Sequence, residues 1–105
     1  MSGMLGDRMA REAINAAGGA WVDDCLSSRD RSLIVVASLV TQGGAGARLR
    51  GHLRWAIEHG ATPEELEALI ALLAVYAGYP RASTAMEALR DELGPANDRE
   101  DSADD

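Results

Sequence analysis

Apolar residues recur along most of the chain at intervals of three and four positions, the spacing of one face of a helix. The clearest stripe lies between residues 63 and 77, where Leu66, Leu69, Ile70 and Leu73 follow one another on one side. Weaker or shorter stripes predict further helices over 7–17, 29–41, 45–59 and 80–93. No Asn-Gly or Asp-Gly hairpin dipeptide occurs, so the expected fold class is all-α with about five helices.

Residues that begin and end helices lie at the ends of these stripes. Ser27 with Asp30, and Thr62 with Glu65, have the three-residue spacing of a capping box, and Pro63 suits a first helical turn. The expected stops are the glycines at 18–19, 43–44, 60, 78 and 94. The β-branched cluster at 34–36 would also suit a strand, but the length and the caps of that segment favour a helix buried nearly all round.

The composition limits the size of the core. The chain has 105 residues, of which 47% are hydrophobic, but none is Phe. The core must therefore come from Leu, Ala, Val and Ile, and burial shared between subunits is an obvious supplement, so we expect a homo-oligomer that associates through helix packing. Residues 1–94 are expected to form one helical domain, and residues 95–105, rich in acids, a disordered tail.

Charge and cysteine content exclude several classes of function. The formal net charge is −7 and the chain has no basic stripe, so we expect no nucleic-acid partner. Cys25 is the only cysteine, which leaves no internal disulfide and no CxxC pair, and the two histidines have no metal-ligand spacing, so no metal is expected. The longest apolar run, 33–37, is too short to span a membrane, and we expect a soluble cytoplasmic protein.

Four segments in order and register carry a resemblance to a known family. They are Leu-Ser-Ser-Arg-Asp-Arg-Ser-Leu at 26–33, Gly-His-Leu-Arg-Trp-Ala at 51–56, His-Gly-Ala-Thr-Pro-Glu-Glu-Leu at 59–66 and Ala-Val-Tyr-Ala-Gly-Tyr-Pro at 74–80. Together they resemble the carboxymuconolactone decarboxylase family, over about residues 21–89. The resemblance implies the AhpD-like helical fold and a homo-oligomer, trimer or hexamer.

The same resemblance argues against a thiol peroxidase. Peroxidase members of that fold use Cys-x-x-Cys-x-x-x-His with an upstream glutamate, and His52 matches the histidine of this motif. Ala45 and Arg48 stand where the two cysteines would be, and Ser32 falls near the glutamate. A chain without the thiol pair cannot carry out that chemistry. Cys25 leaves the peroxidase only as a formal alternative.

For the decarboxylase branch, the resemblance implies loss of CO₂ from a small carboxylated, unsaturated lactone of aromatic acid degradation, without a cofactor. Such a reaction needs a donor at the developing oxyanion, a general acid and cations that hold carboxylates. His52 is the candidate acid or oxyanion donor. Arg48, one turn before His52, is the favoured carboxylate-binding residue, with Arg31 and Tyr79 as further substrate-binding candidates.

Each of these residues also has a structural interpretation. His52 could bond a neighbouring helix, Arg31 could tie a structural carboxylate, and the arginines at 29 and 81 could be solvated or paired. His59, at a helix end, is expected to favour the helix dipole only. A non-catalytic, ligand-binding oligomer of the same family, and an enzyme acting on another small metabolite, remain alternatives.

Overall fold

A computed structural model describes residues 3–22 and 25–94, with side chains from residue 7 onward. Within these ranges the chain forms helices and no strand, which confirms the predicted all-α class. The helices are α1 (Gly3–Trp21), α2 (Ser28–Gln42), α3 (Ala47–Glu58), α4 (Pro63–Ala77) and α5 (Tyr79–Leu93). The predicted tail at 95–105 lies outside the described residues.

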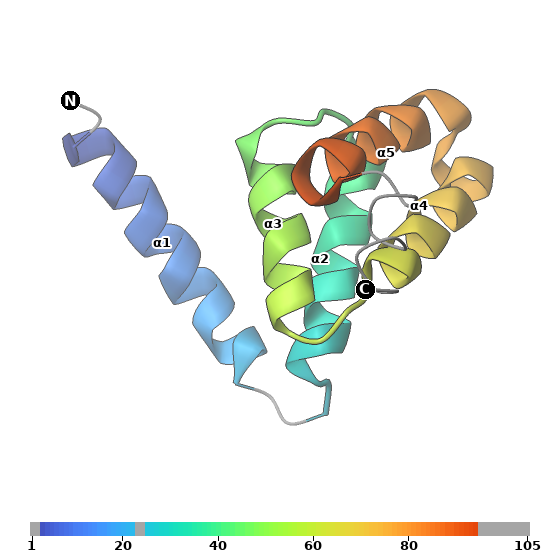
Figure 1. The fold of residues 1–105 in the computed structure, drawn as a ribbon. Coiled ribbons are helices and arrows are strands. Elements are labelled where there is room, and N and C mark those ends of the chain that lie inside the picture. Colours follow the sequence, from blue (N-terminus) through green and yellow to red (C-terminus); the bar gives the residue numbers. More distant parts are fainter. Residues whose placement is uncertain (1–2, 23–24, 95–105) are drawn as a thin grey trace.

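Helices α2 to α5 form the body of the molecule, and α1 lies to one side of it (Figure 1). Helix α3 packs on α2 and α5, and α4 also packs on α2 and α5. As a result α3 and α4 lie on opposite sides of the body, and the outer surfaces of these two helices face in different directions (Figure 1).

The predicted end of the first helix is wrong. Helix α1 continues through Gly18 and Gly19 to Trp21. A glycine inside a helix costs only about 1 kcal/mol, which does not by itself end a helix. The indole of Trp21, the last residue of α1, contacts the rings of Trp55 and His59 at centroid distances of 6.1 and 5.8 Å. The extra turn of α1 therefore ends in contact with the α3 side of the body.

The other predicted caps are confirmed. The Ser27 hydroxyl accepts a hydrogen bond from the Asp30 backbone N–H at the start of α2. Thr62 and Glu65 form a complete capping box at the start of α4. The hydrogen bond that the Thr62 backbone N–H donates to the Glu65 carboxylate is the main cause that lowers the pKa of Glu65. The backbone takes a positive φ at 43, 44, 60, 78 and 94, all glycines, so the chain turns where a side chain would be strained.

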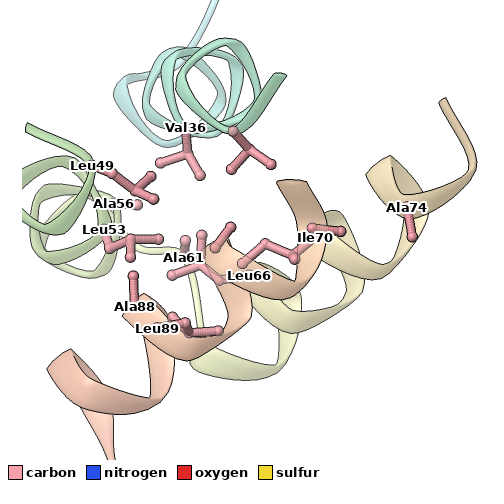
Figure 2. Packing of buried hydrophobic residues seen from close by; sticks show 13 residues of the cluster. Val36, Leu49, Leu53, Ala56, Ala61, Leu66, Ile70, Ala74, Ala88 and Leu89 are labelled. Atoms are coloured by element: carbon pink, nitrogen blue, oxygen red, sulfur yellow. The ribbon is translucent and has the colours of Figure 1, made fainter. Parts of the chain in front are cut away.

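The core of the body is built from small and medium aliphatic side chains (Figure 2). Leu53, Leu66, Ile70 and Leu89 are completely buried and come from three different helices. Alanines fill the closest approaches between helices, and Ala56, Ala85 and Ala88 are also fully buried. The absence of aromatic rings from this core agrees with the composition, and it lets the helices approach closely. No helix in the described ranges is long and apolar enough to cross a membrane.

Candidate functional site

One side of α3 borders an open hollow of about 510 Å³, which we call the α3 hollow. Its lining residues are Ala47, Arg48, Gly51, His52 and Trp55. Positions 47, 51 and 55 follow one another at intervals of four, as do positions 48 and 52, so a single helix presents all five on one side. The small side chains of Ala47 and Gly51 leave the space open. A Cβ added to Gly51 would have no neighbour within 4 Å.

His52 is half-buried at the edge of this hollow. Its ring meets that of Trp55 edge-on, with the centroids 5.5 Å apart. The pKa of His52 is lowered from its ordinary value of 6.5. Burial is the larger cause, and the positive charge of Arg48 is the second. At neutral pH the imidazole is therefore uncharged, and such a ring has one N–H donor and one acceptor nitrogen.

Arg48 lies one turn before His52 and is exposed at the hollow. Two other arginines of α3 have acidic partners: Arg50 pairs with Asp91 and Glu92, and Arg54 pairs with Glu92. Among the residues that the structure describes, Arg48 forms no ion pair and no side-chain hydrogen bond. Its guanidinium is thus available to an anionic ligand in the hollow.

Arg31 lies on α2, is half-buried, and is not among the residues that line the α3 hollow. Its Nε and Nη2 atoms are buried, and neither has a hydrogen-bond partner within 3–22 and 25–94. Burying such donors without acceptors is costly, so this side chain is suited to hold an anion. The structural tie to a carboxylate that the sequence allowed for Arg31 is not seen among these residues.

Tyr79 does not reach the α3 hollow and is not among its lining residues. It is the first residue of α5, whereas the ion pairs between α5 and α3 come from Asp91 and Glu92, about 18 Å further along the helix at 1.5 Å per residue. The remaining arginine candidates are occupied elsewhere: Arg29 pairs with Asp30 and Glu65, and Arg81 donates to the Thr41 carbonyl.

A second imidazole lies further along the same side of α3, and the sequence did not reveal its contacts. The Nδ1 atom of His59 is 2.7 Å from the Oγ of Ser32, a buried side chain of α2. The His59 ring also stacks on Trp55, with centroids 5.9 Å apart. Rings of His52, Trp55 and His59 thus form a continuous edge along α3. The sequence does show that His52 and His59 are seven positions apart, which places them on the same side of a helix. The contact of His59 with Ser32 depends on how α2 crosses α3.

No group of three or more His, Cys, Asp or Glu side chains that could hold a metal ion occurs in the described parts of the chain. Cys25 lies in the connection between α1 and α2, where it is exposed, and it does not line the α3 hollow. The lining side chains that carry polar groups are the neutral imidazole of His52, the guanidinium of Arg48 and the indole of Trp55. They can hold an acidic molecule and donate a hydrogen bond to it.

The sequence is similar to a known protein family and to one characterised enzyme. The sequence profile described as "Carboxymuconolactone decarboxylase family" matches residues 9–91. The 4-carboxymuconolactone decarboxylase of Acinetobacter baylyi (strain ATCC 33305 / BD413 / ADP1) is 38% identical over 71 residues, which are 68% of this chain and 52% of that enzyme. The chain therefore spans about half the length of this relative. No solved structure is significantly similar to the chain.

Proposed function

The chain belongs to the carboxymuconolactone decarboxylase family, and from this premise we propose that it is a decarboxylase-type lyase that acts on a small carboxylated lactone. The observation that carries the proposal is the pairing of Arg48 and His52 on one wall of the α3 hollow. The name of the Acinetobacter relative supports the substrate class. A hollow of about 510 Å³ is large enough for a molecule of this kind.

The proposed reaction breaks the bond between a ring carbon and a carboxylate. Carbon dioxide leaves, and the electron pair of the broken bond moves through the ring double bond to the lactone carbonyl, whose oxygen becomes an oxyanion. One proton from solvent then adds to carbon and restores the carbonyl. The residues of the site must therefore stabilise a negative charge that grows on one oxygen.

His52 is suited to that task in its neutral form. Its lowered pKa keeps the ring uncharged at neutral pH, so its N–H group is a hydrogen-bond donor that needs no proton transfer. Of the two roles that the sequence allowed for His52, proton donor or oxyanion donor, the lowered pKa favours the second. The openness of the hollow leaves solvent free to supply the proton.

Arg48 and Arg31 are the proposed carboxylate-binding residues. Arg48 borders the hollow directly, one turn from His52, and could hold a substrate carboxylate on the same wall. Arg31 does not line the hollow, and it is proposed for a second carboxylate because its buried Nε and Nη2 lack an acceptor. Tyr79 has no part in this proposal, since it lies away from the hollow.

The direct test is an assay of the purified chain against carboxymuconolactone and related lactone acids, with released CO₂ as the readout. We expect CO₂ in a one-to-one ratio to the lactone consumed. Binding of the lactone acids without release of CO₂ would contradict the proposal and support the alternative of a non-catalytic binding protein. Turnover of a different acid alone would show that the substrate class is wrong.

The pH dependence distinguishes the two roles of His52. If neutral His52 is the active form, kcat/KM stays constant from about pH 7 to 8, because the ring is already uncharged there. If the charged ring were the acid, kcat/KM would fall about tenfold for each pH unit in this range.

An NMR titration of the His52 ring tests the cause of its lowered pKa. Arg48→Gln removes a positive charge and should move the pKa of His52 upward. Arg50→Gln is the control, since Arg50 faces Asp91 and Glu92.

Replacement of Arg31 by methionine should separate stability from function. The substitution removes buried donors that lack acceptors, so we expect the free energy of unfolding to rise by about 1 kcal/mol. We also expect KM for the lactone acid to rise at least tenfold, because one carboxylate loses its cation. Urea denaturation and steady-state kinetics measure the two effects. A loss of stability with unchanged KM would show that Arg31 has a structural role.

A further inference from the structure

Trp55 is a large apolar side chain that stays half-exposed at the α3 hollow. It is 49% exposed although it contacts three other rings. The His59 ring stacks on it, the His52 ring meets it edge-on, and the Trp21 indole is tilted against it. These contacts hold the indole in place and leave part of its surface facing the hollow that it lines.

The lining residues of the α3 hollow form two neighbouring rows on the helix. Ala47, Gly51 and Trp55 make one row, which carries no charge. Arg48 and His52 make the other, which carries the guanidinium and the imidazole. Ala47 and Gly51 are exposed, and a Cβ added to Gly51 would meet nothing within 4 Å. The two small residues therefore form an open floor, and the indole of Trp55 is a flat wall at its end.

This arrangement fits a flat ring that carries a carboxylate. Arg48 and Trp55 are seven positions apart, which is about 10 Å along the axis at 1.5 Å per residue. A carboxylate held by Arg48 thus places a small ring above Gly51, within reach of the indole. Planar π systems form offset or edge-on contacts with an indole, and these add to what burial alone gives. A saturated ring is puckered and has no π electrons, so it loses this contribution.

The alternative is a purely structural role for Trp55. Its contact with Trp21 joins the end of α1 to α3, and this contact would then be the whole reason for the residue. The exposure argues against this alternative, because tryptophan is highly buried on average and a side chain that only joined two helices would be covered by them. The exposed part of Trp55 lies instead at the hollow that holds the unpaired guanidinium of Arg48.

We propose that Trp55 determines ring specificity in the α3 hollow and that it selects planar, conjugated ring acids over saturated acids of the same size. The inference rests on the proposed function, which places a carboxylated ring in this hollow. It goes further by assigning the selection of the ring to one side chain. This selection acts on binding, so it can be measured without release of CO₂.

The first test compares two small acids on the full chain. Furan-2-carboxylate and tetrahydrofuran-2-carboxylate have the same five-membered ring atoms and carboxylate, but only the first is flat and conjugated, and neither has a lactone carbonyl. In NMR titrations we expect the wild type to bind furan-2-carboxylate at least about fivefold more tightly. This ratio should fall to about one in Trp55→Leu and recover in part in Trp55→Phe. Equal affinities in the wild type, no binding of either acid, or an unchanged ratio in Trp55→Leu would each overturn the proposal.

Fluorescence tests whether the ring acid contacts Trp55 itself. The chain has two tryptophans, so Trp21→Phe leaves Trp55 as the only one and keeps an aromatic ring beside it. Saturating furan-2-carboxylate should change the emission of this variant, with the dissociation constant found by NMR. Trp55→Phe, in which only Trp21 emits, is the matched control and should show a much smaller change. Changes of equal size in the two variants, or no change in either, would overturn the contact.

Two glycine substitutions test where the acids bind. Gly51 and Gly18 both lie inside helices with open space at the Cβ position, so either accepts a larger side chain. Gly51→Leu fills the floor of the hollow and should weaken binding of both acids at least about tenfold. Gly18→Leu should leave both dissociation constants unchanged, and equal effects of the two substitutions would overturn the proposed place of binding.

The CO₂ assay separates this inference from the proposed function. Ring selection that depends on Trp55, without CO₂ release from any lactone acid, would contradict the lyase and support the inference. CO₂ release from lactone acids without ring selection by Trp55 would support the lyase and overturn the inference.

Discussion

Replacing His52 by alanine is expected to lower kcat/KM for CO₂ release by about 10² to 10³, the usual effect of removing one oxyanion donor. The substitution removes the N–H group that the proposed mechanism directs at the lactone carbonyl oxygen. It should leave the fold intact, because His52 is only half-buried and forms no side-chain hydrogen bond within the described residues. Steady-state kinetics with CO₂ as the readout measure the effect, and circular dichroism checks the fold.

The matched control is His59→Gln, on the same side of α3. His59 bonds Ser32 and stacks on Trp55, but it does not line the α3 hollow. We expect kcat/KM to change less than about fivefold, with a small loss of stability from the lost hydrogen bond. Full turnover by His52→Ala, or an equal loss in both variants, would show that His52 has no special role.

Replacing Leu53 by alanine is expected to lower the free energy of unfolding by about 2 to 5 kcal/mol. Leu53 is completely buried and lies where α3 meets the other helices of the body (Figure 2). Its truncation removes apolar burial and leaves a cavity in the core. In a chain of 105 residues this is a large part of the total stability. Urea denaturation, followed by circular dichroism, provides the measurement.

Ile34→Ala is the control for this prediction. Ile34 is 55% exposed on α2, so its truncation removes little buried surface, and we expect a change within about 0.5 kcal/mol. If Leu53→Ala lowered the free energy of unfolding no more than Ile34→Ala does, Leu53 would not be buried between α3 and the rest of the body as described. Because Leu53 directly follows His52, a displaced α3 should also lower turnover in the Leu53 variant.

Local sequence was a good guide to the helices because their signals act over a few residues. The capping box of Thr62 and Glu65 forms within one helical turn. The glycines with a positive φ lie at or just beyond the ends of helices. The exception was the pair Gly18 and Gly19. Their weak helix propensity could not show that Trp21, beyond them, would find Trp55 and His59 as partners.

The candidate site could be predicted only where it lies on a single helix. Arg48 and His52 are four positions apart, so any α-helix presents them together, and the structure places both at the α3 hollow. Tyr79 is in a different position: it is the first residue of α5, whereas the ion pairs of α5 with α3 come from Asp91 and Glu92, near the other end of that helix. The contact between Ser32 and His59 joins residues 27 positions apart, and no local rule gives such a distance.

The amino-acid sequence by itself determined the all-α class, most helix ends, the family and the side of α3 on which Arg48 and His52 stand. The helices, their ends and the shared side of α3 depend on backbone sterics, capping and a period of 3.6 residues, which operate within a few positions of the chain. Only the tertiary structure decided that Arg31 has buried donors without acceptors, that Ser32 bonds His59, and that Leu72, Val75 and Tyr76 of α4 are exposed. Burial is a property of how whole helices pack against one another, and the same apolar stripe can face a core, a partner or water until that packing is known.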